Sequence, residues 1–352
     1  MDNLGLVRYP LTTEYRFLLV SLNIGAILEE VTIHLRRKKL NQMIQGNGLQ
    51  DAYSTTLARI NEQGGSKSRL GMDMLMWLSY SERPLKANEL CHALGVEIGS
   101  ADLNFQNIPA IETLLGCSLG LVIVEASSYT VRLVHYTLQE YLSNNTSLFH
   151  SPHPMIAEVC LTYLNFRCIR GLGPYPSCGP SVTTPLLVYA SCYWGTHVRK
   201  ETTETVNTLA LRLLDGFDKH VSSGILAWGG CEGWHQRPEL SDYCGFTGLH
   251  YAAYLGIVET AVALLETKKS DLNATDEMGK TAISWAARNG RRAMVKMLLQ
   301  REYVTPNTAD QYGRTPLLWA VGRGHWGVVE MLLKWKDVTS STADQDCRTP
   351  LS

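Results

Sequence analysis

The sequence has little of what marks secreted, membrane or nucleic-acid-binding proteins. Its 32 basic and 33 acidic side chains leave a formal net charge of −1, so no global field attracts nucleic acid or a membrane surface. The nine cysteines include no CxxC pair, which argues against a disulfide framework or a zinc site. The apolar stretch over residues 17–28 is too short to cross a bilayer, and no signal peptide is recognisable. We therefore expect an intracellular, cytoplasmic protein of two or three domains that makes no membrane contact.

Catalytic and cofactor motifs are also lacking. The sequence has no HExxH motif, no Ser-His-Asp or Cys-His arrangement and no glycine-rich phosphate loop. The string nearest to a P-loop, Gly64 to Ser68 (GGSKS), has the wrong order and follows a helical stretch over residues 55–63. A P-loop requires Gly-x-x-x-x-Gly-Lys-Ser/Thr directly after a strand. The sequence thus predicts a chain that is not an enzyme and that binds no cofactor and no metal.

What the sequence does contain is a period of 34 residues in its C-terminal third. The period is first visible in four aspartates, Asp242, Asp276, Asp310 and Asp344. The same register holds glycines, threonines and a leucine pair, namely Gly245, Gly279 and Gly313 with Cys347 in the fourth unit, Thr247, Thr281, Thr315 and Thr349, and Leu264-Leu265, Leu298-Leu299 and Leu332-Leu333. A period of this length indicates a solenoid.

Each unit of this period is predicted to form a pair of helices. In the third unit, Thr315 and Pro316 are typical of a helix start, because the hydroxyl caps free amides and proline stands where no N–H is needed. Gly324 then lets the chain turn back. The next helix carries Leu332 and Leu333 on one apolar stripe. One pair of helices cannot bury this stripe alone, so the units must stack.

Three short segments give the repeats a specific resemblance: Gly245 to Ala253 (GFTGLHYAA), Gly279 to Ala287 (GKTAISWAA) and Gly313 to Val321 (GRTPLLWAV). They resemble ankyrin repeats, with one residue more than the usual ~33. The resemblance implies an ankyrin solenoid over residues 236–352, made of three complete units and a truncated fourth. Since ankyrin stacks bind other proteins, it also implies a protein–protein interaction role.

Residues 66–150 are predicted to form a winged-helix domain. Its expected elements are three helices, a β-hairpin and a helix that follows directly, over residues 69–80, 86–94 and 109–119, then 121–124 with 130–134. Many winged helices bind DNA. Between Arg83 and Arg132, however, the only basic residue is Lys86, against five acidic ones. Because DNA affinity comes mainly from Lys and Arg on phosphates, the sequence predicts that nucleic acid is not a partner.

The remaining parts of the chain are predicted to be helical. Residues 1–65 form a helical segment, and residues 151–235 form a helical connector between the winged helix and the repeats. Within the connector, residues 171–185 hold three glycines and four prolines, which indicates a loop. The predicted fold class is therefore mainly α: a helical segment, a winged helix, a helical connector and a C-terminal ankyrin-repeat solenoid.

Four motifs outside the repeats carry a second resemblance: Phe17 to Asn23 (FLLVSLN), Ser81 to Lys86 (SERPLK), Glu89 to Leu94 (ELCHAL) and Val134 to Leu142 (VHYTLQEYL). Together they resemble the region after the nucleotide-binding core of fungal NACHT–ankyrin proteins, which are signal-transducing NTPases related to NOD-like receptors. The resemblance covers about residues 11 to 235. It implies that residues 1–65 follow a NACHT core that this chain lacks.

On this resemblance the chain is the regulatory half of a signalling receptor. The alternative is that it forms part of an ATP/ADP-dependent switch whose NTPase core lies upstream. A gene fragment, an alternative start and a decayed paralogue are all compatible with the sequence.

The resemblance also points to His135. In such proteins a winged-helix histidine within a His-x-x-x-Gln-Glu pattern approaches the phosphates of bound ADP, and His135 followed by Gln139 and Glu140 matches that pattern. A helix start offers free amides that favour anions. The alternative is a histidine that is packed or hydrogen-bonded at the junction of strand and helix.

Variable positions of the repeats are predicted to contact a protein partner. They are Glu277, Met278, Lys280, Arg288, Asn289, Gln311, Tyr312, Arg314 and Arg323. Lys280, Arg314 and Arg348 share one register, in a row that begins with Phe246. This row predicts a basic groove that prefers an acidic face on the partner. The alternative is an ordinary solvated charged face.

A second row of the repeats is aromatic. Tyr251, Trp285 and Trp319 recur at the repeat period. They are predicted to pack between neighbouring units, because this position of an ankyrin repeat holds a buried leucine.

Overall fold

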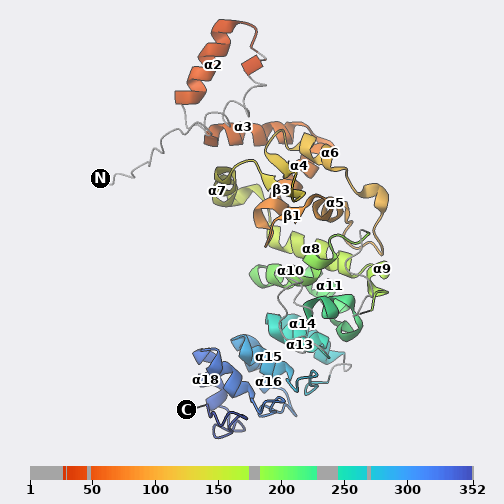
Figure 1. The fold of residues 1–352 in the computed structure, drawn as a ribbon, viewed down its shortest axis with the longest axis vertical. Coiled ribbons are helices and arrows are strands. Elements are labelled where there is room, and N and C mark those ends of the chain that lie inside the picture. Colours follow the sequence, from red (N-terminus) through yellow and green to blue (C-terminus); the bar gives the residue numbers. More distant parts are fainter. Residues whose placement is uncertain are drawn as a thin grey trace, which may run out of the picture. The chain divides into compact units, whose positions relative to one another are not determined.

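The structure, a computed structural model, is mainly helical, which confirms the predicted fold class. It describes residues 27–28, 30–45, 49–173, 183–227, 245–267 and 271–350. The predicted motif at residues 17–23, Asp242 and most of the loop over 171–185 lie outside the described residues. The chain divides into two compact units (Figure 1). The first joins Met1–Leu94 with Ile108–His150, and the second joins Gly95–Asn107 with Ser151–Ser352.

The first unit contains the winged helix. Its elements in chain order are α2 (Ile33–Gln45), α3 (Leu49–Glu62), α4 (Gly65–Tyr80), β1 (Leu85–Lys86), α5 (Ala87–Gly95), α6 (Ile111–Cys117), β2 (Val122–Glu125), β3 (Thr130–Leu133), α7 (Tyr136–Asn144) and the 3-10 turn η2 (Thr146–Leu148). The strands form an antiparallel sheet in the order β1-β3-β2. The predicted hairpin is β2 and β3, in which Val124 pairs with Val131.

The strand β1 was not predicted from the sequence. Leu85 pairs with Val131 and Lys86 with Thr130, so these two residues form the third strand, at one edge of the sheet. A segment this short shows no alternation of apolar and polar residues, and its signal is lost between Pro84 and the start of α5. Leu85 and Val131 are both buried, which places the core between sheet and helices.

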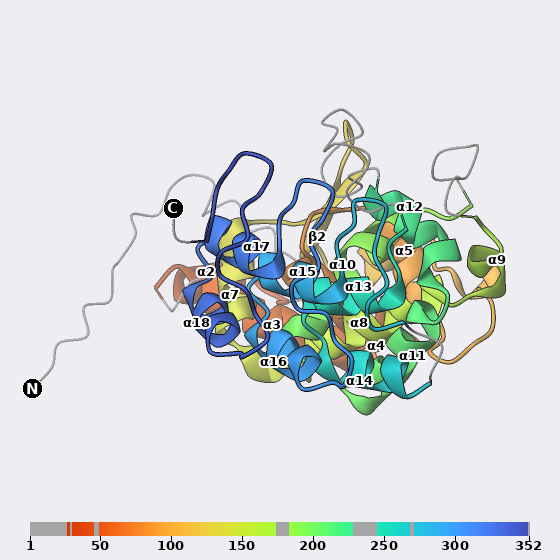
Figure 2. The same ribbon diagram turned by 90° about the horizontal axis from the view of Figure 1, so that it is seen from below.

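The second unit contains the connector helices and the repeats. Its elements are η1 (Phe105–Asn107), α8 (Pro152–Leu164), α9 (Arg167–Arg170), α10 (Leu187–Lys200), α11 (Glu204–Leu214), η3 (Phe217–Lys219), α12 (Val221–Ala227), α13 (Gly248–Leu255), α14 (Val258–Glu266), α15 (Ala282–Arg288), α16 (Arg292–Leu299), α17 (Pro316–Gly322) and α18 (Trp326–Leu333). The predicted pairs of helices are α13–α14, α15–α16 and α17–α18. The loops that connect successive pairs project side by side (Figure 2).

The repeat signature works locally as predicted. Thr247, Thr281 and Thr315 are the N-caps of α13, α15 and α17, and each hydroxyl accepts a hydrogen bond from an amide three residues on. His250 completes the first cap, since its Nδ1 accepts from the amide of Thr247 at 3.1 Å. Its Nε2 donates to the carbonyl oxygens of Ala274 and Lys280 at 3.0 and 3.1 Å. This histidine therefore ties the first unit of the stack to the second.

The connector helices pack directly against the repeats, and α8 to α12 belong to the same compact unit as α13 to α18. Trp194 of α10 meets Tyr251 of α13 edge-on at 5.6 Å, and Phe217 stacks on the same ring at 4.8 Å. Tyr251 also donates a hydrogen bond to the carbonyl oxygen of Ser191 at 3.4 Å. The helices α10 and α11 thus cover the first repeat, as another repeat would. The sequence-based boundaries at residues 65, 150 and 235 stay predictions.

Candidate finger surface of the ankyrin repeats

The turns that precede the pairs of helices are called fingers here and are numbered by repeat unit. The periodic aspartates build these turns. Asp276 Oδ1 accepts hydrogen bonds from the amides of Met278 and Lys280 at 3.0 and 2.8 Å, and Asp310 and Asp344 do the same in the next two turns. Gly279 has a φ of 77°, in the left-handed region that favours glycine. The amide of Gln311 donates to the carbonyl of Met278 at 2.9 Å, so each finger is bonded to its neighbour. These contacts explain why Asp and Gly recur at the repeat period.

The second oxygen of the same carboxylates holds the tryptophans. The indole N–H of Trp285 donates to Asp276 Oδ2 at 2.8 Å, and that of Trp319 donates to Asp310 Oδ2 at 2.9 Å. Tyr251 and Trp285 are fully buried, which confirms the packing interpretation for both. Burial raises the pKa of the Asp276 carboxyl, while the hydrogen bonds from Lys280 and Trp285 act against that shift. The aromatic row is therefore part of the framework that positions the fingers.

Removing one of these carboxylates should loosen its finger. Asp310→Ala is expected to lower the free energy of unfolding by about 2 kcal/mol, because two amides and one indole N–H lose their acceptor. Urea unfolding measures this change. Asp337→Ala is the control, since Asp337 is exposed and makes no finger contact through its side chain. Equal unfolding midpoints for the two variants would refute the structural role of Asp310.

The structure corrects the predicted groove at Met278 and Lys280. Both are buried, with only 3% and 1% of their surface exposed, so a partner cannot reach their side chains. Lys280 Nζ lies 5.2 Å from the ring centre of Trp285 and 5.6 Å from that of Trp319. Phe246, which begins the row, packs edge-on against Trp285 at 4.9 Å. The row is thus sealed by aromatic rings in the first two units.

Arg288 and Asn289 lie at the end of α15 and are half-buried. The guanidinium of Arg288 lies between two rings, 4.9 Å from the centre of Trp285 and 4.8 Å from that of Trp319. Asn289 donates from Nδ2 to the carbonyl of Trp285 at 2.8 Å. Both side chains therefore support the stack, and Arg288 adds a positive charge beside the aromatic row.

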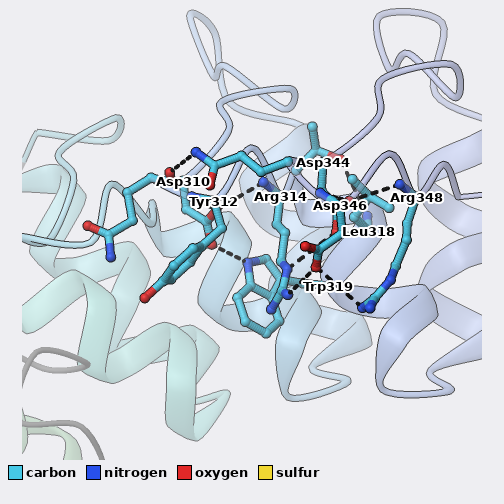
Figure 3. Close-up of polar contacts among 11 residues, drawn as sticks. Asp310, Tyr312, Arg314, Leu318, Trp319, Asp344, Asp346 and Arg348 are labelled. Atoms are coloured by element: carbon cyan, nitrogen blue, oxygen red, sulfur yellow. Dashed lines mark hydrogen bonds and ion pairs between the residues drawn. The ribbon is translucent and has the colours of Figure 1, made fainter.

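In the third and fourth fingers the side chains of this row are partly exposed, and Figure 3 shows their polar contacts. Arg314 lies 5.6 Å from the ring of Tyr312 and 5.2 Å from that of Trp319, with 32% of its side chain exposed. It forms ion pairs with Asp344 at 3.6 Å and with Asp346 at 3.8 Å. We name the set of Tyr312, Arg314, Trp319, Asp346 and Arg348 the finger surface.

Arg348 and Asp346 are the more exposed members of the finger surface. Arg348 pairs with Asp346 at 3.7 Å, and their side chains are 68% and 56% exposed. Two arginines thus share one exposed carboxylate. The sequence singled out Arg348 through its register, but Asp346 was missed because no residue two positions after the other periodic aspartates is acidic.

The remaining predicted contact residues are exposed to solvent. Glu277, Gln311 and Arg323 are exposed, and Tyr312 is 37% exposed. Gln311 accepts at its carbonyl from the side chain of Gln345 at 2.8 Å, so these two glutamines link the third and fourth fingers. The structure brings Gln311, Tyr312 and Arg314 together. Partner binding by these residues stays a prediction.

His135 is placed as the N-cap of α7. Its Nδ1 accepts from the amide of Thr137 at 3.3 Å and lies 2.8 Å from the Thr137 hydroxyl. That hydroxyl also lies 2.8 Å from the Tyr53 hydroxyl, and the ring of His135 packs on Tyr136 at 4.3 Å. One ring nitrogen is therefore used to cap a helix. The expected contact with a nucleotide phosphate stays a prediction.

Over the described ranges, no group of three or more His, Cys, Asp or Glu side chains is arranged to hold a metal ion. Among the helices that the structure describes, none is both long and apolar enough to cross a membrane.

Comparison with known families finds two modules. A family model of ankyrin repeats in three copies matches residues 225–310 and 249–346. A family model described as the winged helix domain of GPI inositol-deacylase matches residues 59–150. A search of curated proteins gave no match. The chain therefore combines a winged-helix module with ankyrin repeats, and the repeats support a role in protein–protein interaction.

Proposed function

We propose that this chain is a non-catalytic regulatory protein whose finger surface binds an acidic face of a partner protein. The observation that carries the proposal is the sharing of one exposed carboxylate, Asp346, between Arg314 and Arg348. A carboxylate on a partner can replace Asp346 on either arginine without leaving a buried charge unpaired. Exposed ion pairs contribute little to stability, so this exchange costs the fold little.

The rings beside Arg314 favour the same role. Tyr312 and Trp319 hold its guanidinium in place, which reduces the side-chain freedom lost on binding. Tyrosine, tryptophan and arginine are also the residues most enriched at interface positions that dominate binding energy. Lys280, which is sealed by the stack, has no part in this proposal.

A charge-reversal experiment tests the finger surface. The double variant Arg314→Glu with Arg348→Glu is expected to weaken binding of a fluorescein-labelled peptide rich in Asp and Glu about tenfold or more, equivalent to about 1.4 kcal/mol. Fluorescence anisotropy at low salt measures the affinity, and a peptide with Asn and Gln at the same positions measures the charge-independent part. Arg348→Glu alone should show the same direction, because its exposed side chain is not needed for folding.

Lys336→Glu is the matched control, since Lys336 is exposed and lies outside the finger surface. It changes the net charge by the same amount as Arg348→Glu. Equal weakening by Lys336→Glu and Arg348→Glu would show that the peptide responds only to overall charge, and the proposal would then fail.

We further propose that partner binding serves the regulatory part of a signalling receptor, as in NACHT–ankyrin proteins, and takes place in the cytoplasm. The support is the resemblance of the four motifs and the presence of a winged helix together with ankyrin repeats.

The alternative is a nucleotide-dependent switch whose NTPase core lies outside this chain. One observation on His135 favours this alternative. Its Nε2 has no hydrogen-bond partner among the described residues and could therefore contact a phosphate. Titration of the purified chain with ATP and ADP separates the two. Binding tighter than about micromolar, worth about −8 kcal/mol, belongs to the alternative.

A further inference from the structure

A cleft of about 460 Å³ lies in the second unit, on elements that the finger surface does not use. Its walls are the end of α10, the start of α11, the turn between α13 and α14, and the start of α16. The polar side chains that line it are Arg199, Thr202, Asn207, Glu259, Arg291 and Arg292. The lining therefore holds three arginines and one glutamate.

None of the three arginines forms an ion pair with any described carboxylate. Arg199 comes from the last turn of α10, whereas Arg291 and Arg292 open α16. Arg199 and Arg292 are exposed, and Arg291 is half-buried. Glu259 is the only acidic side chain in the lining, while Glu330 of α18 lies near Arg292 outside it. The cleft thus carries uncompensated positive charge from two separate elements.

Arg291 is fixed in place by the neighbouring repeat. Its Nε donates to the carbonyl oxygen of Tyr254 at 2.9 Å, and its side chain crosses Gly256, where a Cβ would come within 2.8 Å of Arg291 Cδ. Burial lowers the pKa of Arg291, and the charge of Arg199 adds to that shift. Because Nε is occupied, the two terminal nitrogens of the guanidinium are the ones available to a ligand.

Asn207 adds a neutral donor. Its Oδ1 lies 3.3 Å from the hydroxyl of Thr202 and 3.4 Å from that of Thr260, and both hydroxyls donate to it. With Oδ1 occupied, Nδ2 has no acceptor among the residues the structure describes. The cleft therefore offers a neutral N–H beside the three guanidinium groups.

We propose that this cleft binds a phosphomonoester group. Three guanidiniums and an amide donor match a dianion with three terminal oxygens, since arginine pairs with phosphate through two parallel hydrogen bonds. A carboxylate carries one negative charge and two oxygens, so it neutralises less of the charge of three arginines than a phosphate dianion does. Phosphorylated side chains are commonly recognised by arginine clusters of this kind.

Fluorescence anisotropy on the full chain tests the proposal. The probe is a fluorescein-labelled peptide with one phosphoserine among neutral residues, and the same peptide with serine or glutamate at that position provides the comparison. The phosphopeptide is expected to bind, and the serine peptide is not. Arg199→Gln and Arg292→Gln should each weaken phosphopeptide binding about tenfold, because both side chains are exposed and their removal leaves the fold intact.

Lys296→Gln is the matched control, since it removes one positive charge from the exposed face of α16 outside the cleft. Equal weakening by Lys296→Gln, equal binding of the glutamate peptide, or no binding of the phosphopeptide overturns the proposal. Competition by free phosphoserine separates two sources of the same chemistry. Displacement at equal concentrations supports a small phosphomonoester, and displacement only by unlabelled phosphopeptide supports a phosphorylated protein. The finger-surface variants do not touch this cleft, so the two proposals fail independently.

Discussion

Acidification from about pH 7.5 to about pH 5 is expected to destabilise the second unit by about 6 kcal/mol, or about 2 kcal/mol for each of three buried histidines. His197, His220 and His250 are all buried, and burial lowers the pKa of each from the ordinary value of 6.5, to about 3 for His197 and to about 4 for the other two. The loss is comparable with the whole stability of an ordinary domain.

The hydrogen bonds of these histidines explain why they stay neutral. In His220, Nδ1 accepts from the amide of Ser222 at 3.1 Å, and Nε2 donates to the carbonyl of Leu164 at 3.0 Å. In His250, Nδ1 accepts from the amide of Thr247. A second proton would place an N–H against an N–H in both cases. In His197, Nε2 lies 3.1 Å from the Tyr189 hydroxyl and Nδ1 lies 2.9 Å from Nδ1 of His153. The charge of Lys200 disfavours a second proton on His197 further.

The sign of the pH effect follows from the lowered pKa values. The unfolded chain takes up protons on these histidines as the pH falls through about 6.5, whereas the folded chain takes them up only near the folded pKa. The free energy of unfolding is therefore highest above pH 6.5 and falls below it, down to about pH 4 for His220 and His250 and about pH 3 for His197. The carboxyl of Asp276 opposes the trend, because burial raises its pKa.

Urea unfolding at a series of pH values between about 7.5 and about 5 measures this loss, in a window above most carboxylate titrations. His250→Asn provides the control. It is expected to be less stable than the natural chain at neutral pH. Its stability should fall less steeply as the pH drops, because its unfolded chain takes up about one proton fewer over this range. A free energy of unfolding that stays constant across the window would contradict the neutral assignment of all three histidines.

The repeat region could be predicted closely from the sequence because each unit repeats the same local physics. The threonine caps, the periodic aspartates and the leucine pairs give a signal that adds up over successive units. The winged-helix order was also visible, apart from the two residues of β1. The sequence of the connector predicts helices but contains no repeat. The packing of these helices against the first repeat could therefore not be predicted.

The candidate site was predicted less well, because register does not determine exposure. Lys280, Arg314 and Arg348 occupy one position in successive units, yet their exposure rises along the row. Lys280 lies inside the stack between two tryptophans, whereas Arg314 and Arg348 lie in its last fingers. The cleft of Arg199 and Arg291 could not be predicted at all, since it joins a non-repeated helix to a repeated one.

Gly248→Ala is expected to cost about 3 kcal/mol of stability, because it places a methyl group against backbone. A Cβ at Gly248 would lie 2.1 Å from the carbonyl oxygen of Leu214 and 2.8 Å from its carbonyl carbon. Leu214 is the last residue of α11, so neither atom can move without shifting that helix. Ala282 and Pro316 stand at the same register in the next two units, which shows that the repeat itself accepts a side chain there.

Glycine at position 248 is therefore required by the connector and not by the repeat. Gly322→Ala is the matched control, since a Cβ there meets no atom within 4 Å and its φ is not positive. Replacing this helical glycine should stabilise the fold by up to about 1 kcal/mol. Urea unfolding monitored by near-UV circular dichroism follows the packing of Trp194 on Tyr251, which the shift of α11 is expected to disturb. Equal unfolding midpoints for Gly248→Ala and the natural chain would show that α11 does not pack on the first repeat as closely as the structure places it.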